Sequence, residues 1–473
     1  MRDRLARCAA LAAILAALAA GCGGNGSDPF TEPEAPTGPT GPPAPEPPSE
    51  PLPLLAPSPC RDARVAAASM PFTPEALRAR RAAVLEAIPA SVAIWPGAAD
   101  MGWTEGEPER PESDFHYLAG LGPGDVWLVL ARTPAGRVET FLYVDTAAVP
   151  GAGSGRAADL TGVGDVRCLA DAAAEIPDLL AATAEPGAAG RILLAHSIFA
   201  GLDRTVLPAL DTTGLEVGRA DDHVLPLRPA KDAEEIERLR RAARITAAGL
   251  AAALGAIGPD ILEGDLEAVI ETVFADSGAV RRSFPSIVAS GGNAIQWHYS
   301  RNDDPLDAGE LVVVDVGAEF GRYAGDVTRT LPVSGTFTDR QRALYELVLG
   351  AKQAAVEAAG PGVTLQELET IARDRMDELD EAAGNLCPDL PCSAYFGHRL
   401  SHGVGLDVHD PLPSYVPLEP GMVFTIEPGL YISGEGVGIR IEDDYLVTET
   451  GVELLSAGLP ETVEEIEAAL ARP

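Results

Sequence analysis

The stretch that most constrains the fold runs from Val312 to Thr330 and reads VVVDVGAEFGRYAGDVTRT. Asp315 lies in a run of valines typical of a buried strand, and Asp326 follows in another apolar setting. An unpaired carboxylate inside a core is costly. Two strands joined by a turn near residues 319–322 would bring the aspartates close, and side-chain alternation decides whether they share a face. Either aspartate alone is typical of a strand end or a turn.

Histidines cluster in a later segment, FGHRLSHGVGLDVHD, which contains His398, His402 and His409. The spacing of the first two resembles a helical metal-binding pair, but Gly403 and Gly405 argue against a helix that continues there. We therefore expect these histidines in an irregular or extended segment.

Two further segments carry carboxylates in apolar surroundings. In TIEPGLYI, Glu427 follows an apolar run, and in VGIRIEDDYLV the alternation directs Arg440 and Glu442 to one face. A pair of divalent cations would account for all the oxygen and nitrogen donors together, and a carboxylate-rich set suits manganese or cobalt better than structural zinc. The candidate donors are the carboxylates of Asp315, Asp326, Glu427 and Glu442, with an imidazole from the histidine segment as a further ligand.

These motifs, in this order, closely resemble the pita-bread metallopeptidases (family M24), and within them the Xaa-Pro aminopeptidases (aminopeptidase P) and prolidases. The resemblance includes FPSIVASGGNAIQWHY, which contains His298, and extends over about residues 70–465. It implies that Asp326 and Glu442 bridge two metals, that Asp315 binds one metal, and that His402 and Glu427 bind the other.

The resemblance also implies catalytic roles. Glu427 is the expected general base, His298 and His409 are expected to stabilise the oxyanion, and His398 and Arg440 are expected near the substrate. The implied reaction removes the first residue from peptides with proline in second position, through a hydroxide held between two metal ions. Two departures from the family pattern, Arg399 in place of a glycine and Pro411 after His409-Asp410, concern substrate fit.

Three alternatives to this function remain. The first is an Xaa-Pro dipeptidase (prolidase), although residues 410–426 contain no Lys or Arg to hold a free carboxylate. The second is a non-catalytic binding module on the same fold, and the third is a metal-free hydrolase such as a creatinase. The complete ligand set disfavours the last two.

The amino-terminal segment MRDRLARCAALAAILAALAAGC has a charged start and a short apolar stretch, which is typical of a secretory signal. Its ending resembles a bacterial lipoprotein processing site, so residues 1–21 are predicted to be removed and Cys22 to carry the lipid. The alternative is an ordinary cleaved signal. Thirteen prolines between Asp28 and Pro59 predict that residues 22–60 form an extended tether. We therefore expect an anchored protein of the bacterial cell envelope.

Four cysteines remain after this leader, and an oxidising compartment would allow three pairings among them. The loop from Cys387 to Cys392 is the easiest to close, with Cys60 and Cys168 left over. The net charge of -36 argues against nucleic acid or an anionic membrane surface as a partner. Expected partners are proline-containing peptides, and homo-oligomers remain open.

Helical and strand patterns alternate from Thr73 onward, which predicts an α/β fold of the α+β type. We expect an aminopeptidase P-like mixed α/β domain over residues 61–229 and a pita-bread (creatinase/aminopeptidase-like) catalytic domain over 230–473. Capping boxes at Thr338 and Thr364 predict two helix starts.

Other polar residues are expected to have ordinary roles. His196 and His223 are interpreted as incidental, and His116 as a packing or interface residue. The Asp443-Asp444 pair is interpreted as a solvated strand end.

Overall fold

A computed structural model of the protein describes residues 55, 58–66, 68, 70–97, 99–100, 110–122, 124–145, 154–195 and 214–471. The predicted signal peptide, Cys22 and most of the predicted tether lie outside these residues, as does His196. Residues 51–473 form one compact unit. Among the described residues, no helix has the length and apolar character needed to cross a bilayer.

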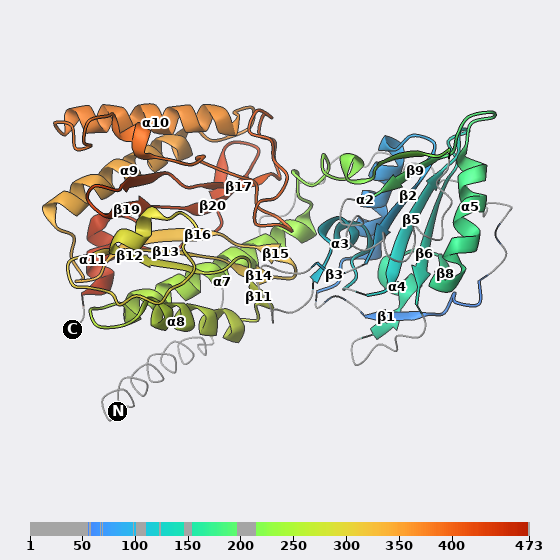
Figure 1. Ribbon diagram of the computed structural model, residues 1–473, viewed down its shortest axis with the longest axis horizontal. Coiled ribbons are helices and arrows are strands. Elements are labelled where there is room, and N and C mark those ends of the chain that lie inside the picture. The colour runs from blue at the N-terminus through green and yellow to red at the C-terminus, as the bar shows by residue number, and fades with distance from the viewer. Residues whose placement is uncertain are drawn as a thin grey trace, which may run out of the picture. The chain divides into compact units, whose positions relative to one another are not determined.

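The first part of this unit is built on a six-stranded sheet, with helices α2 and α5 beside it (Figure 1). The strand order is β10-β9-β2-β5-β6-β8, and both parallel and antiparallel neighbours occur. The strands are β2 (Ser91–Pro96), β5 (Val126–Arg132), β6 (Val138–Val144), β8 (Asp165–Cys168), β9 (Arg191–Leu194) and β10 (Glu216–Arg219). The helices are α2 (Pro74–Ala87), α3 (Ser113–Ala119), α4 (Ala157–Thr161) and α5 (Ala172–Thr183).

Two small strand pairs complete this part. Strand β1 (Arg64–Ala66) pairs with β7 (Ser154–Arg156), and β3 (Ala99–Asp100) pairs with β4 (Arg110–Pro111). All six residues of β2 are buried, which explains its apolar sequence SVAIWP: helices cover both faces of a strand in such a position. The alternation of helices and strands predicted from Thr73 onward is confirmed in this part.

The second part places two pairs of helices on either side of its strands (Figure 1). Helix α7 (Ala233–Ala256) packs with α8 (Glu263–Asp276), and α9 (Asp339–Ala358) packs with α10 (Leu365–Ala382). The chain then ends its described part with α11 (Val463–Leu470). The capping boxes predicted at Thr338 and Thr364 are both formed.

The strands of the second part form several short sheets between these helices. The orders are β12-β13-β16, β11-β14-β15, β17-β20-β21 and β18-β19. Their bounds are β11 (Arg281–Arg282), β12 (Ile287–Ser290), β13 (Leu311–Val316), β14 (Ala318–Phe320), β15 (Tyr323–Ala324), β16 (Val327–Pro332), β17 (Val423–Ile426), β18 (Gly429–Ile432), β19 (Val437–Arg440), β20 (Asp443–Val447) and β21 (Val452–Leu454). The predicted fold class, with helices and strands mixed in both parts, is confirmed.

The valines of β13 divide between two apolar clusters. Val312 and Val314 belong to the main core that includes α7, α8 and α9, whereas Val313 packs with Ile287 and Tyr299. Because side chains alternate along a strand, Asp315 lies on the face of Val313 and away from the main core. The strand therefore buries its valines and still presents one carboxylate to the opposite side.

Candidate active site

The two aspartates of the opening stretch lie on one face of a hairpin. Strand β13 pairs antiparallel with β16, and Asp315 lies opposite Thr328 in this register. Asp326 precedes Thr328 by two residues, so both point to the same side. The predicted hairpin is confirmed, and its alternation places Asp315 and Asp326 together.

A break in both strands of the hairpin makes room for this arrangement. Gly317 follows β13 and Gly325 precedes β16, and the two backbones approach so closely that a Cβ atom on Gly317 would lie 2.1 Å from the Gly325 carbonyl oxygen. Any larger residue at Gly317 would force the strands apart. The glycines therefore fix the position of Asp326 beside the sheet.

Glu442 reaches the same face from another sheet. Its backbone bridges Thr328 of β16, and the Thr328 hydroxyl donates a hydrogen bond of 2.6 Å to its carboxylate. Glu427 lies directly after β17, whose last residue Ile426 is paired with Asp443. Three separate segments thus bring carboxylates to one place.

The histidine segment is extended rather than helical, as its glycines predicted. It runs beside β17, where Thr425 N–H donates to the His402 carbonyl and Glu427 N–H donates to the Leu400 carbonyl. His402 Nε2 lies 3.5 Å from Asp326 Oδ2 and 3.6 Å from Glu427 Oε1. Single ligand atoms of Asp326, His402 and Glu442 all lie within 4.8 Å of one another.

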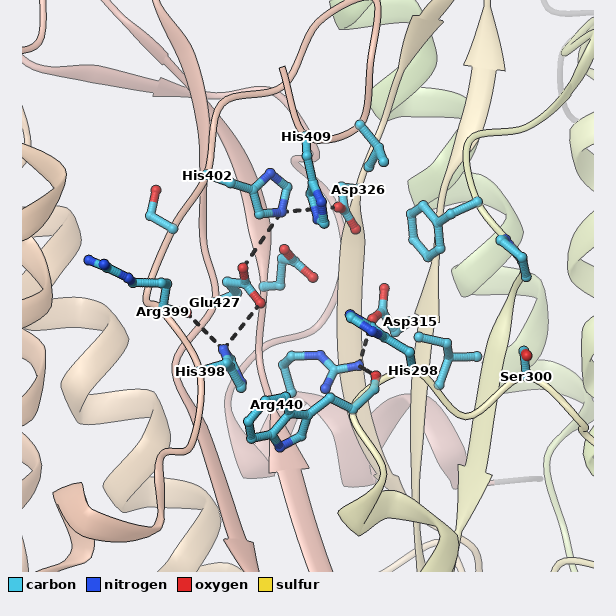
Figure 2. A pocket seen from close by; sticks show the side chains of 17 residues that line it. His298, Ser300, Asp315, Asp326, His398, Arg399, His402, His409, Glu427 and Arg440 are labelled. Carbon is cyan, nitrogen blue, oxygen red and sulfur yellow. Dashed lines mark hydrogen bonds and ion pairs between the residues drawn. The ribbon is translucent and has the colours of Figure 1, made fainter. Parts of the chain in front are cut away.

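A pocket of about 650 Å³ contains the whole set (Figure 2). It is lined by every candidate site residue: His298, Asp315, Asp326, His398, His402, His409, Glu427, Arg440 and Glu442. Its wall also has apolar side chains, among them Phe284, Ile287 and Trp297, and three polar ones, Ser300, Arg399 and Ser401.

The acidic side chains of the pocket outnumber its arginines, and Arg440 is bonded to one of them, Asp315. Burial and the neighbouring Glu442 raise the pKa values of Asp326 and Glu427 well above their ordinary range, and burial and Asp315 raise that of Glu442 to about 8. Asp315 receives a hydrogen bond of 2.6 Å from Arg440, but its other oxygen, Oδ1, is buried and has no hydrogen-bond partner among the described residues. Divalent cations fit this site, because they would satisfy these oxygens and offset their mutual repulsion.

Two histidines of the pocket, His398 and His402, are neutral and oriented by hydrogen bonds. Burial lowers the pKa values of His402 and His398 to about 3. His402 Nδ1 lies 3.0 Å from the Gly403 carbonyl and so carries the proton, which leaves Nε2 directed at the carboxylates. His398 instead uses both ring nitrogens within the wall, with the Arg399 carbonyl and the Tyr431 hydroxyl.

This chain is similar to known proteins both in sequence and in fold. Residues 237–449 match the family model described as metallopeptidase family M24. An Xaa-Pro aminopeptidase of Haemophilus influenzae is 40% identical over 261 residues, which cover 51% of this chain and 60% of that protein. An Xaa-Pro dipeptidase of Pyrococcus furiosus is 39% identical over 245 residues, which cover 51% and 67%. The solved proline aminopeptidase P II from Yersinia pestis has a TM-score of 0.74 at 32% identity and covers 84% of this chain and 99% of its own.

The chain belongs to metallopeptidase family M24. The resemblance noted in the sequence and the pita-bread fold are therefore confirmed. Membership in a metallopeptidase family implies divalent metal ions, in agreement with the carboxylate set. The matched region spans about 60% of the length of the Haemophilus relative, whereas the whole Yersinia structure is covered.

A buried glutamate outside the pocket holds the segment that contains His298, one of the lining residues. Glu263, at the start of α8, is fully buried and accepts hydrogen bonds from Ser290, Asn293, Tyr299 and the Asp304 backbone, all of them uncharged donors. Tyr299 is the neighbour of His298 and donates at 2.7 Å. Sequence interpretation missed Glu263, because its donors are spread over segments that meet only in the fold.

Tyr431 is a second residue that was missed. Its hydroxyl lies 2.7 Å from Arg440 Nη1 and 2.8 Å from His398 Nε2, so it joins two candidate site residues. The sequence held a usable signal, because Glu427, Gly429 and Tyr431 recur with a period of two in TIEPGLYI.

The interpretation of Asp443 and Asp444 as a solvated strand end is wrong. Both are 1% exposed. Asp443 accepts hydrogen bonds from Arg329, Lys352 and Ser456, whereas Asp444 accepts one from the Asp326 backbone N–H at 3.0 Å. Asp444 thus supports the position of Asp326, and Asp443 neutralises two buried cations.

The remaining histidines and the cysteines agree with the sequence interpretation. His116 is buried, its Nδ1 lies 2.9 Å from the Leu121 carbonyl, and its ring contacts Phe72, which supports a packing role. His223 is half-buried and does not line the pocket. The disulfides are Cys387–Cys392, as expected, and Cys60–Cys168. These bonds leave the four thiols unavailable as metal ligands.

Proposed function

We propose that the protein is a metal-dependent aminopeptidase that removes the first residue from peptides with proline in second position. The observation that carries this proposal is the pocket in which Asp315, Asp326, Glu427 and Glu442 converge around His402 with too few cationic partners. The named activities of the Haemophilus and Yersinia proteins support the substrate class.

The proposed metal ligands follow from the donor set. Asp326 and Glu442 would be shared between two cations, with Asp315 on one side and His402 and Glu427 on the other. Manganese is proposed because carboxylate oxygens dominate the set and cysteine is absent from the pocket lining. When bound, such cations lower the pKa of water and polarise a peptide carbonyl.

The chain's own residues supply the rest of the proposed chemistry. The Glu427 carboxylate accepts a proton from the attacking water and can deliver it to the departing amide nitrogen. His298 and His409 line the pocket and can donate hydrogen bonds to the carbonyl oxygen as charge develops there. Arg440 and Tyr431 hold His398 in the wall, where its ring and that of Trp297, 5.6 Å away, can contact the proline ring.

An Xaa-Pro dipeptidase is the second candidate, supported by the named activity of the Pyrococcus relative. A dipeptidase needs a cation for the free carboxylate of its substrate. Arg440 does not meet this need, because it is 3% exposed and bonded to Asp315 and Tyr431. The aminopeptidase is the preferred function, because Arg440 is committed and the compared proteins from Haemophilus and Yersinia are named for that activity.

Hydrolysis of Xaa-Pro peptides with and without chelator and added manganese tests the proposal. We expect activity on Xaa-Pro tripeptides that chelator abolishes and manganese restores, with Asp326→Asn inactive and Asp307→Asn, at an exposed position near the site in sequence, unchanged. Activity confined to dipeptides would establish the prolidase instead. Full activity of Asp326→Asn would refute the bridging role, and absence of both metal and hydrolysis would favour a binding module.

The cellular location is also a proposal. We propose an envelope protein anchored through Cys22, and the two disulfides support an oxidising compartment. Metabolic labelling with a fatty acid, compared between the wild type and Cys22→Ala, tests the anchor.

A further inference from the structure

Arg399 lies in the wall of the pocket, next to His398 in the chain. Its side chain is 70% exposed, and its guanidinium lies 3.9 Å from Glu369, beyond hydrogen-bond distance. In Figure 2 it extends from the loop beside His398 and lies apart from the group of carboxylates. It is therefore a cation at the accessible part of the pocket.

The other guanidinium of the pocket lining is already committed. Arg440 is 3% exposed and donates to Asp315 and Tyr431. An anionic group on a substrate would thus find Arg399 as the arginine able to pair with it.

The backbone beneath Arg399 is held firmly. Arg373 of α10 donates to the carbonyl oxygens of Ser393 and His398, and the Arg399 carbonyl bonds His398 Nδ1 at 2.7 Å. Glu369 pairs with Arg373 at 3.0 Å, so its attraction for Arg399 is shared. The backbone of Arg399 is therefore fixed, whereas its guanidinium is solvated and only weakly held by Glu369. Such a side chain can leave Glu369 and pair with a carboxylate of the substrate.

We propose that Arg399 binds a carboxylate on the part of the substrate that follows proline. This inference rests on the proposed function. The guanidinium repels the α-ammonium of the first residue, so the downstream part of the peptide is the part it can attract. The carboxylate is either the carboxyl end of a short peptide or an acidic side chain. The net charge of -36 repels an anionic peptide, and the positive charge of Arg399 would offset this repulsion locally.

Matched peptides test this assignment. The first pair is Ala-Pro-Ala with a free or an amidated carboxyl end, and the second is Ala-Pro-Asp-amide with Ala-Pro-Asn-amide. We expect kcat/KM to favour the charged member of at least one pair by about two- to five-fold, as for an exposed ion pair. Arg399→Gln should remove this preference, Arg399→Lys should keep part of it, and about 0.5 M salt should reduce it. The pair that shows it identifies the source of the carboxylate.

Arg375→Gln is the matched control. Arg375 is an exposed arginine of α10 that pairs with Glu378 and does not line the pocket, so its loss should leave the preference unchanged. Equal ratios in the wild type and in Arg399→Gln would overturn the inference.

Binding separates this inference from the proposed reaction. Calorimetry with manganese compares the dipeptide Pro-Ala with Pro-Ala-amide. Charge-dependent binding that Arg399→Gln abolishes supports the role of Arg399 even if no peptide is cleaved, whereas cleavage without any charge preference retains the aminopeptidase and rejects the role of Arg399.

Discussion

Glu442 and Asp443 are neighbours in the chain, and both are buried, yet their surroundings are opposite. Burial and Asp315 raise the pKa of Glu442 to about 8. Burial alone would also raise the pKa of Asp443, but Arg329 and Lys352 lower it below its ordinary range. The alternation of β-strand side chains directs one residue to the pocket and the other to internal cations. Asp443, a structural acid, is thus neutralised by cationic side chains of the chain itself. Glu442, an acid of the pocket, has no such pair and can bind an external cation.

The largest expected effect is the loss of activity when a pocket carboxylate becomes neutral. Glu442→Gln should lower kcat/KM by about a hundred-fold or more, because it removes a proposed shared metal ligand. The variant should remain as stable as the wild type in chelator, because its amide oxygen can still accept from Thr328. Steady-state kinetics, metal analysis and thermal unfolding in chelator measure the three effects. A strong loss of stability in chelator would mean that Glu442 is a structural acid like Asp443.

A change at Asp443 is expected to lower the stability of the fold. Asp443→Asn should lower the free energy of unfolding by about 3–5 kcal/mol, because buried Arg329 would lose its carboxylate and Lys352 would keep Glu461 alone. Denaturant unfolding measures the change, with the exposed Glu464→Gln as control. An unchanged stability together with lost metal would reverse the proposed roles of the two neighbours.

Glu263 tests a third kind of buried acid, one that is satisfied by uncharged donors. Glu263→Gln should lower the free energy of unfolding by about 1–3 kcal/mol, because the NH2 of the new amide cannot accept hydrogen bonds from the donors around it. We also expect kcat to fall more than KM rises, since the Tyr299 anchor next to His298 is weakened. Unfolding and kinetics of Glu263→Gln, beside Glu267→Gln on the half-buried face of the same helix, measure this. A change in stability alone would limit Glu263 to the fold.

The smallest effect is expected from pH in the presence of chelator. Glu442 has a pKa of about 8 in the fold against an ordinary value of 4.5, so the folded chain binds more protons than the unfolded chain between these values. Its contribution to stability is present below the lower value and is lost as pH rises through the higher one. Thermal unfolding in chelator should therefore give a lower Tm at about pH 8.5 than at about pH 6. Manganese should narrow this difference, and a Tm that rises with pH in chelator would contradict it.

The sequence predicted the parts of the site that local patterns encode. The valine run with Asp315, the period of two at Arg440 and Glu442, and the glycines near His402 each determine a local conformation that the structure confirms. The resemblance to the M24 family then implied that these segments meet in one metal site. What local patterns could not predict were the partners of buried acids: Arg329 and Lys352 lie 114 and 91 residues from Asp443.

The Cys60–Cys168 disulfide has a mechanical consequence. Cys60 lies just before β1, which is held by only three residue pairs with β7 and could be peeled away from its end. The disulfide instead transfers a pull on the preceding chain to the end of β8, at the edge of the six-stranded sheet. The folded part can thus bear a load at its amino-terminal end without unravelling, and reduction of this one bond would remove that resistance.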